Sequence, residues 1–159
     1  MIIRPILPEE HHLLETFIYE AIFVPPGEQA PPREIIFEPD VFVYIKDFGT
    51  LPHDCCVVAE IDGQVVGTAW ARVIGAYGYI DDETPELAIA VLPQHRGQGI
   101  GTKLLEALFE QLRQRGCRQT SLAVQQANPA AKLYLRAGYR IVAEKEEEYL
   151  MIKNLEANT

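Results

Sequence analysis

The sequence predicts a single α/β domain, spanning residues 1–159, on a mixed and mostly antiparallel sheet of about six or seven strands. Strand-like and helix-like hydrophobic patterns alternate along a chain that is 48% hydrophobic and 23% charged, as in folded globular domains. The nearly all-apolar run ELAIAVLP has the pattern of a strand buried on both faces. A strand-helix-strand unit from 86 to 124 implies a parallel, right-handed connection, so strands 86–92 and 119–125 should form the centre of the sheet.

The first fifty residues predict a strand, a helix and a proline-rich loop. Residues 2–6 have strand character, and Pro8 then opens a helix with acidic residues in its first turn. The apolar face of this helix recurs at helical spacing through Leu13, Leu14, Phe17, Ile18, Ala21 and Ile22. In the run FEPDVFVYIKDFG, Pro39 favours a helix start, whereas the β-branched and aromatic residues 41–45 favour a strand. We predict a helix there.

The middle of the chain predicts a hairpin followed by the central strand. Two β-rich runs flank Asp62-Gly63, which is a strong signal for a two-residue hairpin turn. The run YGYIDDETP is predicted as a loop that leads into the strand 86–92.

The last sixty residues predict two helices and three strands. A leucine-rich helical stripe follows the central strand and ends at Gly116, a C-cap glycine. The strand 119–125 comes next. Asn128 and Pro129 then suit the N-cap and first position of a short helix that Gly138 closes. The runs YRIVAE and EYLMIKN predict two final strands around an acidic turn.

Composition and charge exclude several classes of function. The net charge is −9 and the pI about 4.9, so the chain lacks the basic character of a nucleic-acid-binding protein. No run of apolar residues reaches the length of a membrane span. The cysteines, Cys55, Cys56 and Cys117, show no metal-ligand spacing and suit free thiols in a reducing compartment. We therefore expect a cytoplasmic protein with no metal, nucleic-acid or membrane partner.

The segment HRGQGIG, residues 95–101, carries three glycines between the central strand and the long helix. The first backbone N–H groups of a helix are unpaired, and the helix N-terminus carries partial positive charge. Glycines allow an anion to approach this backbone, and phosphate is the usual ligand of such a junction. The spacing does not match a P-loop, because Thr102 and Lys103 stand in the wrong order, and it breaks the dinucleotide-binding fingerprint.

The pattern that fits is Arg96-x-x-Gly99-x-Gly101 after an apolar strand. It resembles the acetyl-CoA signature of the GNAT superfamily of N-acetyltransferases. The later run ANPAAKLYLRAGYRIV is similar to the second conserved region of that family, with an asparagine, a short helix bearing a tyrosine, a glycine and an aromatic residue. The resemblance covers residues 54–153, whereas residues 24–50 match no particular subfamily.

The resemblance implies acetyl-CoA as co-substrate, with its pyrophosphate on the backbone N–H groups from Arg96 to Thr102. The resemblance also implies that the parallel strands 86–92 and 119–125 splay apart, with helices flanking the sheet. The pantetheine arm would lie along the central strand and enter at that splay, and the acetyl carbonyl would sit near the Val91 amide. Asn128 has two compatible interpretations, as a helix cap and as a contact of the cofactor arm. The residues that the resemblance assigns to the cofactor are Ile89, Val91, Arg96, Gly97, Gln98, Gly99, Ile100, Gly101, Thr102 and Asn128.

Two residues carry the predicted chemistry of acetyl transfer. The resemblance places Tyr134 as the acid that protonates, or hydrogen-bonds to, the departing CoA thiolate. It places Glu86 as the general base that removes a proton from the amine, and a chain of water molecules is the alternative base. A carboxylate at the start of a buried strand should have a raised pKa.

The predicted function is acetylation of a primary amine by direct attack in a ternary complex, with a small cationic amine as the substrate. The acidic residues 81–83 are one reason for that substrate class, although such a run also suits a solvated turn. The alternatives are a non-catalytic acyl-CoA sensor and acetylation of a protein or peptide amine. By analogy with the family, a homodimer is compatible with the sequence.

Overall fold

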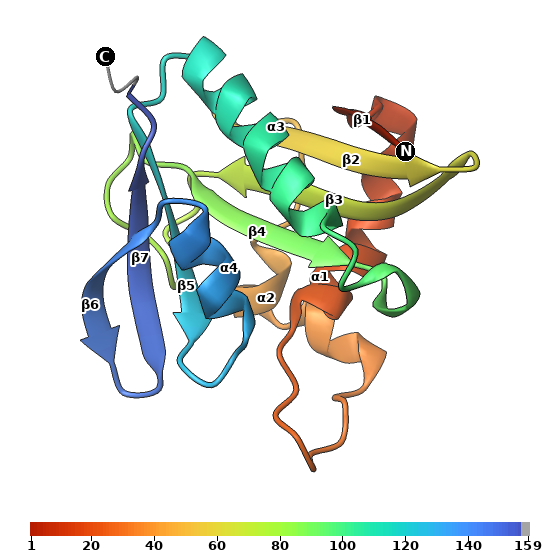
Figure 1. Cartoon of the computed structure of the whole chain (residues 1–159), viewed down its shortest axis with the longest axis horizontal. Coiled ribbons are helices and arrows are strands. Elements are labelled where there is room, and N and C mark those ends of the chain that lie inside the picture. Colours follow the sequence, from red (N-terminus) through yellow and green to blue (C-terminus); the bar gives the residue numbers. More distant parts are fainter. Residues whose placement is uncertain (157–159) are drawn as a thin grey trace.

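The computed structural model describes residues 1–156. Its core is a seven-stranded sheet in the order β1-β2-β3-β4-β5-β7-β6, and β4 and β5 are its parallel pair (Figure 1). The strands are β1 Ile2–Pro5, β2 Cys55–Ile61, β3 Gln64–Arg72, β4 Glu86–Val91, β5 Gln119–Gln125, β6 Arg140–Lys145 and β7 Glu148–Asn154. The α-helices are α1 Leu14–Ala21, α2 Pro39–Phe42, α3 Ile100–Gln114 and α4 Ala130–Arg136, and short 3-10 helices span Pro8–Leu13, Arg33–Phe37 and Pro93–His95. The predicted fold class, sheet order at the centre and strand number are confirmed.

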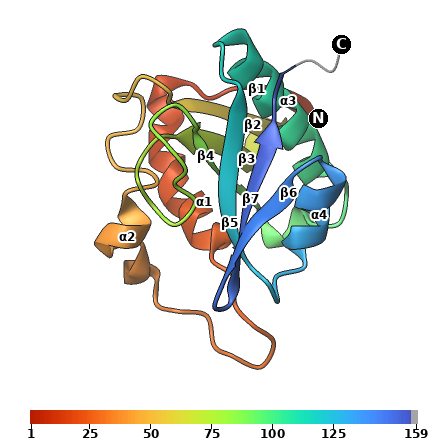
Figure 2. The same cartoon turned by 90° about the vertical axis from the view of Figure 1, so that its left-hand side faces the viewer.

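Helices cover both faces of the sheet. Figure 2 shows α3 and α4 on one side and α1 and α2 on the other. Each face has its own hydrophobic core, and successive strand residues alternate between the two, as Val57 and Val58 of β2 do. Both side chains are buried, which explains why the central strands read as nearly continuous apolar runs.

Local sequence signals account for most of the element boundaries. Asp62 and Gly63 both have positive φ, at 52° and 79°, and join β2 to β3 as the hairpin signal predicts. The segment after Pro39 is helical, as predicted, although its regular α-helix is only one turn long. The N-cap of α4 is Pro129 and not Asn128, but the Asn128 Oδ1 still accepts a hydrogen bond from the Ala130 N–H at 2.9 Å. The predicted capping interaction is therefore present one residue earlier than the formal boundary.

A buried ion pair fixes the segment that follows α2. Arg72, at the end of β3, donates from Nε and Nη2 to the two carboxylate oxygens of Asp54, both at 2.9 Å. Its Nη1 donates to the backbone oxygens of Val43 and Lys46. The indole N–H of Trp70 donates to the Tyr44 backbone oxygen at 2.9 Å. These bonds attach residues 43–46 to β3 and set the position of the Tyr44 side chain.

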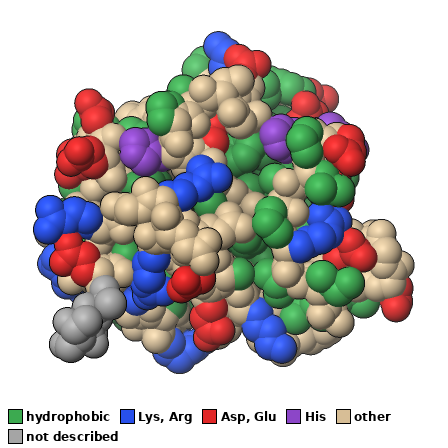
Figure 3. All heavy atoms as spheres, turned by 90° about the horizontal axis from the view of Figure 1, so that it is seen from above, with side chains coloured by type: hydrophobic (Ala, Val, Ile, Leu, Met, Phe, Trp, Pro, Cys, Tyr) green, Lys and Arg blue, Asp and Glu red, His purple; other side chains and the backbone are tan. Residues whose placement is uncertain are grey.

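The surface carries both signs of charge. On the face drawn in Figure 3, Lys and Arg side chains lie among Asp and Glu side chains and form no continuous basic area. Among the described residues, no helix combines the length and the apolar character that crossing a membrane requires.

Asp54→Asn should lower the free energy of unfolding by about 3–5 kcal/mol, because it leaves the buried Arg72 guanidinium without its counter-charge. Urea denaturation monitored by circular dichroism measures the effect. Glu156→Ala is the matched control, since it breaks the exposed Arg118–Glu156 pair and should leave stability almost unchanged. An equal decrease in the free energy of unfolding in the two variants would show that the buried pair stabilises the fold no more than the exposed pair does.

Candidate acetyl-CoA and amine site

The site is built around the divergence of β4 from β5. The two strands pair at Glu86 and Ser121 and then separate. Leu92, just beyond β4, donates its N–H to the Val66 oxygen of β3 at 2.8 Å. Because alternate residues turn their backbone groups to opposite neighbours, Ile89 and Val91 turn theirs toward the gap. The gap therefore exposes the backbone groups that the sequence analysis assigned to a cofactor arm.

The glycine junction lies at the wide end of this gap. Gly97 and Gly99 have φ of +76° and +80°, and a Cβ atom at either position would meet nothing within 4 Å. Gly99 is the N-cap of α3. Within the described part of the chain, the first N–H of this helix with a carbonyl partner is that of Lys103, which donates to the Gly99 oxygen. The preceding N–H groups are available to an anion.

Arg96 departs from its predicted role. Its backbone N–H donates to the Pro93 oxygen at 3.3 Å, so the free N–H groups begin at Gly97 and not at Arg96. Its side chain donates from Nε to the Val91 oxygen at 2.9 Å and lies 3.4 Å from a carboxylate oxygen of Glu20. The guanidinium therefore links the end of β4 to α1. It also occupies the Val91 oxygen, so that only the N–H of Val91 stays available to a cofactor arm.

Gly101 serves packing more than backbone conformation. A Cβ atom there would lie 3.3 Å from the Leu133 Cδ2 and 3.8 Å from the Ile89 Cδ1. The missing side chain lets α3 approach α4 and β4 closely. Gly101 nevertheless still lines the same groove as Gly97 and Gly99.

A groove of about 520 Å³ follows the junction and the exposed edge of β4. It is bordered by nine of the ten residues assigned to the cofactor, the exception being Gln98. The nine are Ile89, Val91, Arg96, Gly97, Gly99, Ile100, Gly101, Thr102 and Asn128. Residues from β4, α3 and α4 therefore come together in one continuous surface.

A second cavity of about 500 Å³ opens toward α1 and α2 and meets the groove. The two share lining residues, namely Ala21, Phe23, Ile89, Asn128 and Tyr134. Leu87 and Ala88 of β4 and Ala123 and Val124 of β5 also line the second cavity, so it reaches the gap between the strands. We call it the acceptor cavity. The separation of β4 and β5 connects the two faces of the sheet.

Tyr134 lies where the groove and the acceptor cavity meet. It projects from α4, is 8% exposed, and packs its ring against Tyr139 at 5.9 Å between centroids. Burial raises the pKa of the Tyr134 phenol, so the hydroxyl keeps its proton. A protonated hydroxyl at this junction can donate a hydrogen bond to a group in either space.

Glu86 is a buried carboxylate without a cationic partner in the described chain. Its Oε2 accepts hydrogen bonds from the Tyr44 hydroxyl and from the Gly78 N–H, the latter at 2.9 Å, and its Oε1 has no partner among the described residues. Burial raises its pKa, although the Tyr44 and Gly78 bonds act in the opposite direction. The raised pKa agrees with the sequence-based expectation.

Glu86 does not line the acceptor cavity, but Tyr44 does. The sequence analysis gave Tyr44 no role, because one tyrosine in an ambiguous segment carries no signal. A Cβ atom on Gly78 would lie 2.9 Å from the Glu86 carboxyl carbon, so the loop before β4 packs directly on this side chain. Tyr44 thus lies at the cavity wall, in direct contact with Glu86.

The acidic residues of the acceptor cavity are not the predicted ones. Asp81 accepts bonds from the Thr84 hydroxyl and the Glu83 N–H within its own loop, and residues 81–83 do not line the cavity. The acidic lining comes instead from Asp40, from Glu146 and Glu147 in the β6–β7 turn, and from Glu148 at the start of β7. Lys145 is the cation in the lining.

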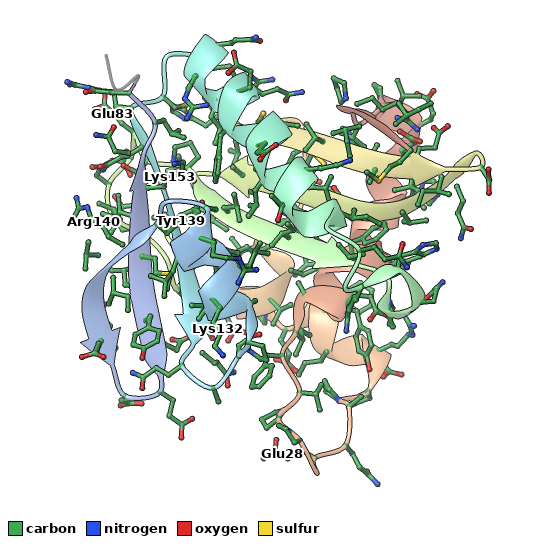
Figure 4. The ribbon with its side chains drawn as sticks, viewed as in Figure 1. Glu28, Glu83, Lys132, Tyr139, Arg140 and Lys153 are labelled. Atoms are coloured by element: carbon green, nitrogen blue, oxygen red, sulfur yellow. The ribbon has the colours of Figure 1, made fainter. Side chains whose placement is uncertain are left out.

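The proline-rich loop lies outside the lining of the acceptor cavity. The acceptor cavity takes Ile22 and Phe23 from the end of α1 but no residue from 24–33. Glu28 lies at the far tip of that loop, away from the sheet (Figure 4).

The model of the Acetyltransferase (GNAT) family matches residues 17–139. The chain belongs to the GNAT family. An uncharacterised N-acetyltransferase from Methanocaldococcus jannaschii is 33% identical over 130 residues, which cover 76% of this chain and 80% of that protein. Thialysine N-epsilon-acetyltransferase from Mus musculus is 34% identical over 114 residues, covering 62% of this chain and 63% of that protein. The chain thus spans less than two thirds of the mouse protein's length.

Solved structures agree on the fold. An N-acetyltransferase from Thermoplasma acidophilum in complex with coenzyme A superposes with a TM-score of 0.70 at 16% identity, covering 96% of this GNAT chain and 98% of that one. The described residues of this GNAT chain contain no group of three His, Cys, Asp or Glu side chains placed to hold a metal ion.

Glu86 should make stability depend on pH in a defined direction. Its folded-state pKa lies above the usual 4.5, so between these values the folded state binds more protons than the unfolded state. The free energy of unfolding contributed by Glu86 therefore falls as pH rises through that interval. Glu86→Gln lacks this titration and should gain stability relative to the wild type as pH rises from 4.5.

Urea denaturation of both proteins at a series of pH values measures this difference. Glu106→Gln removes one exposed charge from α3 and is the matched control. A difference between Glu86→Gln and wild type that stays constant with pH would contradict the prediction.

Proposed function

We propose that this chain transfers the acetyl group of acetyl-CoA to a primary amine of a small cationic molecule, by direct attack in a ternary complex. One observation carries the proposal: the groove at the α3 N-terminus and the acceptor cavity meet at Tyr134, through the gap between β4 and β5. Two substrates that entered from opposite faces of the sheet would therefore meet at one point. Direct transfer requires such proximity.

The groove suits acetyl-CoA by the chemistry of its donors. The N–H groups from Gly97 to Thr102 and the positive end of the α3 dipole would hold the pyrophosphate. The backbone N–H and oxygen of Ile89 would pair with the pantetheine amides, as an added strand pairs with a sheet edge, whereas the Val91 oxygen is already bonded to Arg96 Nε. The Val91 N–H would stabilise the oxyanion that forms when the amine attacks the thioester carbonyl.

The reaction needs a proton removed from the amine and one supplied to the leaving thiolate. Glu86 is the proposed final acceptor of the amine proton, and its raised pKa brings it closer to the working range of a general base. Tyr134 would donate to the CoA sulfur as the C–S bond breaks. Asn128, with its Oδ1 already bonded to Ala130, would offer its side-chain N–H groups to the cofactor arm.

The cationic substrate class rests on the lining of the acceptor cavity. Asp40 and the residues 146–148 supply four carboxylates against the single Lys145. A second positive charge on the acceptor would be attracted there. The mouse relative's name, thialysine N-epsilon-acetyltransferase, also points to an acceptor of this kind.

Isothermal titration with acetyl-CoA tests the groove. We expect the wild type to bind with a Kd near 1 μM, about −8 kcal/mol, and Gly99→Glu to weaken binding by more than about 100-fold. The new side chain would add a negative charge where the pyrophosphate should lie. Gly63→Glu is the matched control, since Gly63 has a similar φ of +79° and equally open surroundings in the β2–β3 turn.

Both outcomes of the titration are informative. Gly63→Glu should bind like the wild type, which would separate backbone strain from the loss of the anion site. No binding of acetyl-CoA to the wild type, or equal binding by Gly99→Glu, would refute the assignment of the groove.

An amine panel scored by release of CoA thiol tests the acceptor class. The compounds are thialysine, lysine, 2,4-diaminobutyrate, 1,4-diaminobutane, n-butylamine and a short peptide with a free N-terminus. We expect kcat/KM to be higher for 1,4-diaminobutane than for n-butylamine, which lacks the second charge. Glu148→Gln should raise KM for 1,4-diaminobutane. The ratio of its kcat/KM to that of n-butylamine should therefore fall by a few-fold, on the order of 1 kcal/mol.

The control is Glu106→Gln, which removes an exposed charge of α3 that is not part of the cavity lining. A panel in which only the peptide reacts would replace the small amine with a protein or peptide amine. Binding of acetyl-CoA without turnover of any compound would favour a sensor.

A further inference from the structure

Tyr44 connects the acceptor cavity to the buried Glu86 carboxylate. Its phenol donates a hydrogen bond to the Glu86 Oε2, and its side chain lines the acceptor cavity. Glu86 is 2% exposed and does not line that cavity. An amine bound in the cavity therefore has Tyr44, and not Glu86, as its nearer neighbour.

The other polar side chains around Glu86 do not link it to the acceptor cavity. Arg72 lies opposite Glu86 in the β3–β4 register, but its guanidinium is bound by Asp54 and by the Val43 and Lys46 oxygens. Ser121, its neighbour on β5, donates its hydroxyl to the Gly78 oxygen.

The remaining charged and titratable groups lie on the loop before β4 and on β7. On the loop, the neutral backbone N–H of Gly78 donates a hydrogen bond to the Glu86 Oε2. Glu148 of β7 is the nearby acidic group, and its charge raises the pKa of both Tyr44 and Glu86. Tyr77 has its hydroxyl bonded to Asp40 at 2.5 Å and therefore points to a different carboxylate.

The position of Tyr44 is held independently of any substrate. Trp70, which is fully buried, donates to the Tyr44 backbone oxygen, and Arg72 donates to the backbone oxygens of Val43 and Lys46. A phenol that gives its only proton to Glu86 has oxygen lone pairs left to accept one. The Tyr44 oxygen is thus prepared to accept a hydrogen bond from a cationic amine.

We propose that Tyr44 is a catalytic residue that relays the amine proton to Glu86. As the ammonium N–H bond breaks, a new O–H bond forms on Tyr44, while the original Tyr44 proton moves to the Glu86 carboxylate. The neutral amine then attacks the thioester carbonyl, the C–S bond breaks, and the CoA thiolate takes a proton from Tyr134. The proton that the attacking nitrogen must still lose to become an amide passes to the Tyr134 phenolate and restores the phenol. The proton held by Glu86 is released to solvent when the products leave. The inference rests on the proposed acetyltransferase function and adds to it the route by which a buried carboxylate serves as base.

The test compares Tyr44→Phe with wild type across pH, using the fastest amine of the panel above and thiol release. At pH 7 we expect kcat/KM for the amine to fall by about 100-fold, the lower end of what a positioned proton-transfer group contributes. The loss should shrink to less than about 10-fold near pH 10, where an alkylamine is largely free and needs no base. The affinity for acetyl-CoA should not change.

Tyr79→Phe is the matched control. The Tyr79 hydroxyl also donates to a carboxylate, that of Asp82 at 2.7 Å, but Tyr79 does not line the acceptor cavity. It should keep the wild-type pH profile. If Tyr44→Phe does not fold, Glu86→Gln tests the relay instead. The amide oxygen of Gln can still accept the hydrogen bond from Tyr44, but it cannot take up the proton. Glu86→Gln should show the same deficit at low pH and the same recovery at high pH.

The possible results distinguish failure of the Tyr44 relay from failure of the proposed acetyltransferase function. A loss in Tyr44→Phe that is constant from pH 7 to 10, or no loss, would assign Tyr44 a structural role and overturn the relay. A wild-type pH profile in Glu86→Gln would overturn it as well. Failure of the wild type to turn over any amine would instead refute the acetyltransferase proposal, and the relay with it.

Discussion

The organisation of this molecule depends on one geometric constraint, the separation of β4 from β5 after a single paired position at Glu86 and Ser121. A parallel pair that stayed closed would use the backbone groups of Ile89 and Val91 in the sheet and leave no path between the two faces. Because the strands diverge, the Ile89 groups and the Val91 N–H face the gap, while the Val91 oxygen is bonded to Arg96 Nε. The groove at α3 and the cavity beside α2 can then share a boundary at Tyr134.

The buried polar groups have two roles: one ion pair holds a segment in place, and one carboxylate is available for proton transfer. Arg72 and Asp54 neutralise each other and satisfy their hydrogen bonds, and so hold residues 43–46 in place. Glu86, one strand away in the same layer, has two hydrogen bonds and no cation. Burial of a charge without a counter-charge is unfavourable, and the carboxylate responds with a raised pKa. The support pair thus positions Tyr44 against a carboxylate that is ready to take a proton.

The glycines of the junction act through two different physical effects. Gly97 and Gly99 adopt positive φ, which a side chain would strain, and they leave the helix N-terminus open to an anion. Gly101 has no such backbone requirement, and its lack of a Cβ permits close packing of α3 on Leu133 and Ile89. One short segment therefore combines a ligand-binding backbone with a tight helix contact, which accounts for glycines that are each costly to order.

Local sequence patterns were sufficient for most of the elements, and the family resemblance selected residues of which nine line one groove. The Asp62-Gly63 turn, the leucine stripe of α3 and the spacing of residues 95–101 involve neighbours along the chain, where propensity and periodicity operate. The tertiary structure alone decided the acceptor side. It brought Tyr44 to Glu86 from 42 residues away, and it placed residues 146–148 and not residues 81–83 at the cavity. Those contacts depend on how loops cross the sheet, and no periodic pattern in a single sequence encodes which loop side chains will meet.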